Sequence, residues 1–167
     1  MKSKEAEKVI RGILADYLAN DKVLQMDNYI QHGDVSTYAH CFNVAVVSYL
    51  ICVKFGIKVC LTEMLIGALL HDFYLYDWHD GRLRPEGLHG FTHPAKALRN
   101  ANKYFDLTER EANIISSHMF PLTLTKVPKC REAVIVCIAD KICATKETTE
   151  GFKYKLLTRL SLIKSTI

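Results

Sequence analysis

The chain has 167 residues, of which 49% are hydrophobic and 24% are charged, and its net charge is +4 at neutral pH. This length fits one domain with a buried core, and the composition excludes a disordered protein. The small positive charge is scattered without a Lys/Arg block, so we expect no specific nucleic-acid partner.

In chain order, the predicted elements are all helical. We expect helices over residues 4–19, 36–55, 62–75, 93–104, 108–119, 129–148 and 151–163. Ser3 and Thr62 are the predicted N-caps of the first and third helices, and Gly56 is a C-terminal signal for the second. Thr108 and Glu111 have the spacing of a capping box.

The remaining segments are predicted to be irregular. Residues 20–33 show no clear pattern, and residues 76–92 contain a proline and three glycines without an apolar period. No segment alternates with a period of two over a useful length. The predicted fold class is therefore all-α, a compact bundle of about six to eight helices. We expect a single domain over residues 1–167, with a core of about 36–145 and flanking terminal helices.

The sequence shows neither a targeting signal nor a cysteine pattern that would indicate a disulfide framework or a zinc site. The first residues read as an amphipathic helix without the apolar stretch of a signal peptide, and the longest apolar run, Val44 to Val53, is too short to span a bilayer. The six cysteines form no CxxC pair, so we expect small buried thiols without disulfides or zinc-finger sites. These features predict a cytoplasmic protein with no membrane partner.

Polar residues interrupt three strongly apolar helical segments. His40 lies among apolar neighbours, His71 and Asp72 follow the apolar run 64–70, and Asp140 follows the run 133–139. Each residue alone is explained as well by one hydrogen bond or ion pair inside the core. Together they require three separate burials of costly polar groups, which a single divalent cation would account for. Imidazole and carboxylate ligands suit Fe, Mn, Ni, Co or Zn better than Ca or Mg.

These four residues resemble the pattern of the HD-domain superfamily of metal-dependent phosphohydrolases. The similarity covers about residues 36–145 and includes the LLHD and ADK contexts of the doublet and of the last aspartate. The resemblance implies that His40, His71, Asp72 and Asp140 hold a catalytic metal. It also implies an enzyme that hydrolyses a small phosphorylated substrate, a phosphate ester or a nucleotide.

Two more histidines resemble those of the binuclear branches of this superfamily. These branches include the cyclic-di-GMP phosphodiesterases and the YqeK-like diadenosine tetraphosphate hydrolases. The resemblance implies that His93 and His118 bind a second metal and that Asp72 bridges the two ions. His89 competes with His93 for this role, and His32 has no assigned role. The chain lacks the GYP signature, which disfavours the cyclic-dinucleotide subclass.

The implied mechanism uses a metal-activated water that attacks phosphorus. Asp72 is the candidate proton acceptor as well as a ligand, and Lys141 is the candidate phosphate contact. Arg82, Arg84 and Lys126 are candidates for binding further parts of the substrate. Each of these basic residues is explained as well by a solvated surface charge or, for Lys141, by a structural ion pair.

Two other functions fit the same residues. Some HD-fold proteins use a di-iron centre for oxidative cleavage of a carbon bond, and the ligand set alone does not distinguish them. A non-catalytic module that binds a nucleotide or a metal is the other alternative, although every matched position is intact. The sequence leaves the oligomeric state open.

Overall fold

The structure is a computed structural model that describes residues 3–80 and 87–164, and the side chains of residues 4–80 and 87–152. Within these ranges the chain forms eight α-helices, which confirms the predicted fold class. They are α1 (Ser3–Ile13), α2 (Ala15–Leu18), α3 (Asp21–Leu24), α4 (Thr37–Phe55), α5 (Leu61–Leu70), α6 (His89–Tyr104), α7 (Glu109–Ser117) and α8 (Arg131–Lys164). A 3-10 helix, η1 (Gln25–Asn28), precedes an antiparallel hairpin of β1 (Ile30–His32) and β2 (Val35–Ser36).

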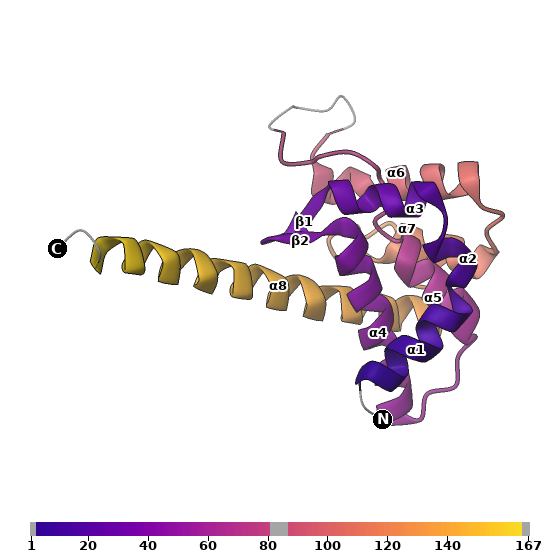
Figure 1. The fold of residues 1–167 in the computed structure, drawn as a ribbon. Helices are drawn as coiled ribbons and strands as arrows, with labels where there is room; N and C mark the ends of the chain where they lie inside the picture. The colour runs from indigo at the N-terminus through magenta and orange to yellow at the C-terminus, as the bar shows by residue number, and fades with distance from the viewer. Residues whose placement is uncertain (1–2, 81–86, 165–167) are drawn as a thin grey trace.

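Helix α4 lies at the centre of the bundle, where it packs against α1, α5 and α8 (Figure 1). Both of its predicted ends are confirmed. The Ser36 side chain accepts a hydrogen bond from the Ala39 amide at 3.2 Å, and Gly56 adopts the left-handed conformation with φ of 63°. By length and composition α4 alone among the described helices is long and apolar enough to cross a membrane. Its apolar faces, however, meet three neighbouring helices, as those of a core helix do.

Helix α5 is shorter than predicted. It begins at Leu61 with Cys60 as its N-cap, so the predicted cap at Thr62 is wrong, and it ends at Leu70 rather than near Leu75. The prediction extended the helix too far because the apolar residues continue after Leu70. Phe73 and Tyr74 are not helical, but they are buried in the core. The helix end therefore coincides with the His71–Asp72 doublet.

Other boundaries also differ from the prediction. The first predicted helix is interrupted after Ile13, and the side chain of its predicted cap Ser3 lies outside the described side chains. Helix α6 begins four residues early, at His89, with Pro94 inside it. The irregular segment 20–33 contains short helices and β1, which were missed because elements of three or four residues are too short for a periodic pattern. The capping box of Thr108 and Glu111 is confirmed at the start of α7.

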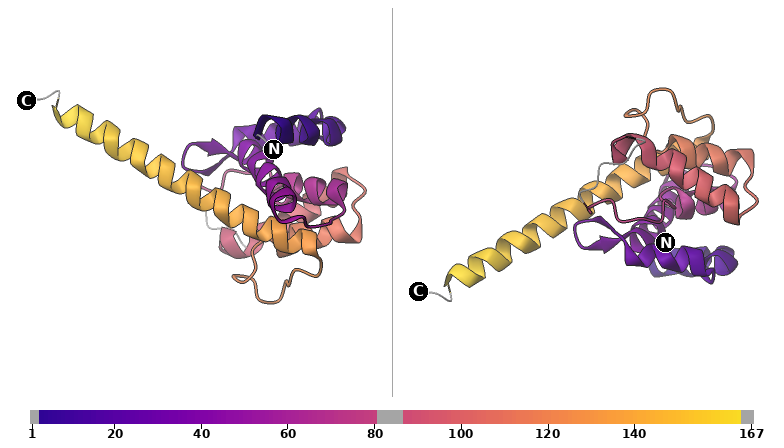
Figure 2. Two further views of the ribbon diagram at one scale, coloured as in Figure 1. Left: turned by 90° about the horizontal axis from the view of Figure 1, so that it is seen from below. Right: turned by 90° about the horizontal axis from the view of Figure 1, so that it is seen from above.

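The two last predicted helices form one continuous helix, α8, which extends away from the bundle (Figures 1 and 2). Gly151 does not end this helix. A Cβ at Gly151 would lie 2.9 Å from the Cα of Gly33, so the glycine allows the turn of the hairpin to approach α8 closely. The β1–β2 hairpin therefore sits against α8 at the point where the helix leaves the bundle.

Candidate metal centre

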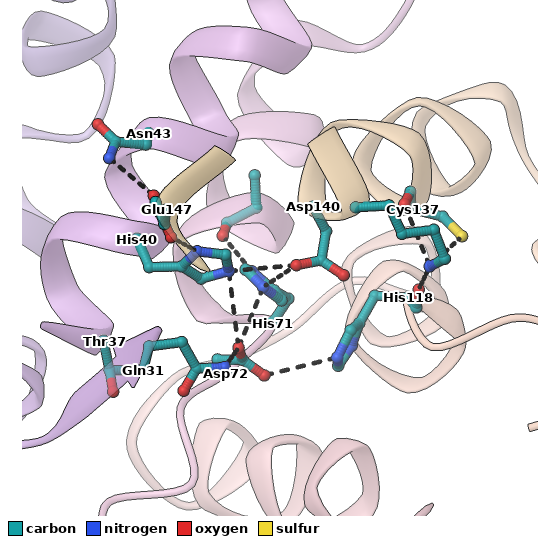
Figure 3. Close-up of polar contacts among 12 residues, drawn as sticks. Gln31, Thr37, His40, Asn43, His71, Asp72, His118, Cys137, Asp140 and Glu147 are labelled. Carbon is teal, nitrogen blue, oxygen red and sulfur yellow. Dashed lines mark hydrogen bonds and ion pairs between the residues drawn. The ribbon is translucent and has the colours of Figure 1, made fainter. Parts of the chain in front are cut away.

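Six predicted site residues converge inside the bundle, and all of them are buried. Figure 3 shows five of them, all except His93. The six residues come from five parts of the chain: His40 from α4, His71 and Asp72 from the end of α5, His93 from α6, His118 from the end of α7 and Asp140 from α8. Helix packing thus brings together residues up to a hundred positions apart, such as His40 and Asp140.

The four imidazoles share one orientation, with Nδ1 bound to the protein and Nε2 directed into the cluster. Nδ1 of His40 donates to Oε2 of Glu147 at 2.7 Å. The other three donate to backbone carbonyls one turn earlier: His71 to Ala68, His93 to His89 and His118 to Ile115, each at 2.8 Å. Because carbonyl and carboxylate oxygens only accept, each Nδ1 carries a proton, and in the neutral ring Nε2 is left as the free ligand atom.

Asp72 lies between two groups of these nitrogens. Its Oδ2 is 3.3 Å from Nε2 of His71 and 3.9 Å from Nε2 of His40. Its Oδ1 is 3.2 Å from Nε2 of His93 and 3.5 Å from Nε2 of His118. Oδ1 of Asp140 belongs to the first group, at 3.1 Å from His40 and 3.6 Å from His71. The carboxylate of Asp72 therefore connects a His40–His71–Asp140 group with a His93–His118 group.

This arrangement fits divalent metal ions. Nε2 of His71 and Oδ1 of Asp72 are buried without a hydrogen-bond partner, which costs about 1–3 kcal/mol for each group if nothing else binds it. Nε2 of His93 and Nε2 of His118 lie 2.8 Å apart. Two nitrogen ligands at about 2.1 Å from one ion are about 3.0 to 3.4 Å apart at octahedral or tetrahedral angles. A bound cation would give the buried atoms of His71 and Asp72 a partner, and it would explain why two Nε2 atoms without protons lie so close together.

The electrostatics of the cluster favour the ligand forms of Asp72, Asp140 and His118. Burial raises the pKa of Asp72, but His71 and His93 outweigh it and hold the pKa well below its usual range. The pKa of Asp140 is also lowered, since the hydrogen bond from His40 and the nearby imidazole of His71 outweigh burial. Burial, with the nearby His71, lowers the pKa of His118 to about 3. Both carboxylates are therefore charged and His118 is neutral at physiological pH.

His40 and His71 behave differently in the metal-free protein. Burial lowers the pKa of His71, but the nearby carboxylate of Asp72 outweighs burial and raises this pKa well above its usual value. Burial also lowers the pKa of His40, but the hydrogen bonds to Asp140 and Glu147 outweigh burial and raise it to about 10. The metal-free site thus holds a proton on His40, and a metal must displace that proton to bind Nε2.

A tight turn after α5 holds the doublet in place. The Tyr74 amide donates to the Asp72 carbonyl at 2.8 Å, and Leu75 adopts a left-handed φ of 56°. Asn100 on α6 donates to the carbonyls of both Phe73 and Tyr74, at 2.9 Å each. The turn is therefore fixed by a side chain from a neighbouring helix, and Asp72 is directed into the bundle.

Two site residues were missed from the sequence, Gln31 and Glu147. Gln31 on β1 donates to Oδ2 of Asp72 at 2.5 Å and accepts a hydrogen bond from the Tyr74 hydroxyl. Glu147 binds His40 and lies seven residues after Asp140, two turns along the same face of α8. That spacing was the available signal for Glu147, whereas no local pattern marked Gln31.

His93, and not His89, occupies the ligand-type position. Nε2 of His93 faces Asp72, whereas Nδ1 of His89 lies 2.9 Å from the Tyr76 hydroxyl. The His89 ring is stacked between His93 and Trp78, with ring centroids at 4.5 and 4.8 Å. His89 therefore contributes to the wall of the site.

A cavity of about 610 Å³ opens onto the cluster. Lys141 lines it, but the Lys141 ammonium already donates to the carbonyls of His118 and Cys137, at 2.9 and 3.3 Å. Lys126 is exposed and is not among the lining residues. The predicted substrate contacts Arg82 and Arg84 lie outside the described residues.

A helical bundle that buries a cluster of imidazoles and carboxylates has the fold and the ligand groups of a helical metal-binding protein. The family model of the HD domain matches residues 37–145, most of the chain, and the protein belongs to this family. HD domains bind divalent metals and are generally metal-dependent hydrolases, within a superfamily of phosphohydrolases. Searches of curated proteins and of solved structures found no match.

Proposed function

We propose that this protein is a metal-dependent phosphohydrolase that acts on a small phosphate ester or a nucleotide with two divalent transition metals, Fe, Mn, Ni, Co or Zn. The observation that carries the proposal is the position of Asp72, whose two buried carboxylate oxygens face two separate groups of imidazole nitrogens. The similarity to the binuclear branches of the superfamily, the YqeK-like branch among them, supports the same assignment.

In this proposal each group holds one ion. His40, His71, Asp140 and Oδ2 of Asp72 form the first ligand set, and His93, His118 and Oδ1 of Asp72 form the second. When bound, the ions would supply Lewis-acid stabilisation of the phosphoryl group and a water of lowered pKa. The chain's own contribution is rigid placement, because every Nδ1 is fixed by a hydrogen bond and every ligand is buried.

The cavity favours a phosphorylated organic substrate. Its volume of about 610 Å³ lies within the range of about 300–1,000 Å³ that is typical of small-molecule sites. Asp72, His93, His118 and Asp140 form its polar side, and Trp78, Met119, Pro121 and Leu122 contribute apolar surface. A phosphoryl group would lie at the polar side, and its organic substituent would pack against the apolar residues.

The test is phosphate release from p-nitrophenyl phosphate, nucleotides and dinucleoside polyphosphates by the Mn²⁺-loaded protein. We expect turnover by the wild type and by the control Asp106→Ala, which changes an exposed carboxylate, and loss of turnover in Asp72→Ala. Absence of phosphate release by the wild type with every metal would contradict the proposal. Oxygen-dependent turnover with iron that releases no phosphate would favour the oxygenase alternative.

A further inference from the structure

The β1–β2 hairpin precedes the family-matched segment, yet it reaches the metal centre. Gln31 and His32 on β1 both line the cavity next to Asp72, His93 and His118. The hairpin therefore adds side chains to the site that the HD-domain match does not include.

Three contacts fix the hairpin in this position. The Gln31 amide is buried and bridges the carboxylate of Asp72 and the Tyr74 hydroxyl. The turn of the hairpin packs on α8, because a Cβ at Gly33 would lie 2.8 Å from the carbonyl oxygen of Glu147. His32, between these two anchors, is therefore held in place before any ligand arrives.

Of the histidines that line the cavity, His32 has ring nitrogens without a hydrogen-bond or ion-pair partner among the described residues. Its ring lies edge-on to His40, with ring centroids 5.1 Å apart, and no hydrogen bond or ion pair joins it to the described residues. Its nitrogens belong to neither of the compact ligand groups found among those residues. His40, by contrast, uses both ring nitrogens, on Glu147 and Asp140. The position of His32 thus suits a ligand in the cavity better than a metal ion.

We propose that His32 is a substrate-contacting residue that donates a hydrogen bond to the phosphoryl group of the substrate. An imidazole N–H beside a cation-binding centre is a suitable donor for an anionic oxygen. The choice of a phosphoryl group as the ligand of His32 rests on the proposed function. Gln31 serves as the positioning residue that joins the hairpin to Asp72.

The test measures binding of inorganic phosphate to the Mn²⁺-loaded protein by calorimetry, together with metal content. His32→Ala is expected to weaken phosphate binding at least about tenfold, the equivalent of one charge-assisted hydrogen bond, without loss of metal. His32→Gln, which keeps an N–H donor, is expected to recover part of the affinity. The control His79→Ala changes an exposed histidine outside the cavity and is expected to bind phosphate like the wild type.

Three results would overturn the inference: no phosphate binding by the wild type, equal binding by the wild type and His32→Ala, or loss of metal in His32→Ala. Turnover of p-nitrophenyl phosphate is measured separately in the same samples. A wild type that binds phosphate through His32 but releases none from esters would reject the hydrolase and still support the inference.

Discussion

Glu147 orients the first ligand histidine, and its removal provides a quantitative test of the metal centre. Oε2 of Glu147 accepts the Nδ1 proton of His40 at 2.7 Å, and Oε1 accepts a hydrogen bond from the Asn43 amide at 3.0 Å. The side chain is only 6% exposed. The carboxylate therefore fixes the His40 tautomer that directs Nε2 towards Asp140 and Asp72.

Glu147→Gln keeps the shape of the side chain but removes its charge. The new amide group also replaces one acceptor oxygen with an N–H donor, so either the Asn43 amide must turn over to accept from it or one donor is placed against another. Loss of such a partner to a metal-binding histidine typically lowers metal affinity about 10- to 100-fold. The same range corresponds to about 1.4 to 2.7 kcal/mol.

The assay is calorimetric titration of the metal-free protein with Mn²⁺. The matched control is Glu150→Gln, one turn along α8, where the side chain is 65% exposed and its ion pair with Lys146 is 3.9 Å long. We expect the control to bind like the wild type. An unchanged Kd for a folded Glu147→Gln protein would refute the positioning role of Glu147.

Three further predictions concern packing and protons. Gly67→Ala places a Cβ 2.7 Å from two Ile114 side-chain carbons, and urea unfolding should show a loss of about 1–3 kcal/mol. Gly33→Ala, at a φ of 61° and against the carbonyl of Glu147, should lower the free energy of unfolding by a similar amount, about 1–3 kcal/mol. Because hydrogen bonds to carboxylates raise the pKa of His40 to about 10, Mn²⁺ affinity should rise with pH below that value. Calorimetry in buffers of different ionisation enthalpy should show proton release, and its absence would contradict this reasoning.

The sequence was sufficient to predict the helical class and the six clustered side chains. Four of them, His40, His71, Asp72 and Asp140, stood out because a charged or imidazole group followed or interrupted an apolar run, and burial of such a group requires a partner. His93 and His118 were predicted only from the resemblance to the binuclear branches of the superfamily. The capped helices α4 and α7 were also predictable, since Ser36, Gly56 and Thr108 act locally. Local signals of this kind depend on near neighbours in the chain.

The features that the sequence did not predict depend on contacts between segments that are far apart in the chain. Glycines usually weaken helices, but Gly151 stays in α8 because Gly33 packs on it. The contribution of Gln31 required knowledge that the hairpin folds back onto Asp72, 41 residues away. The binding of the Lys141 ammonium to the carbonyl of His118 likewise follows from the packing of α7 on α8.

The most direct test of the metal centre is elemental analysis of the purified protein beside Asp72→Ala. Asp72 faces both ligand groups, so its loss should affect both ions. The account predicts about two equivalents of transition metal per chain in the wild type and their loss in the variant. No metal in the wild type after reconstitution with Mn²⁺ or Fe²⁺, or equal metal in both proteins, would contradict it.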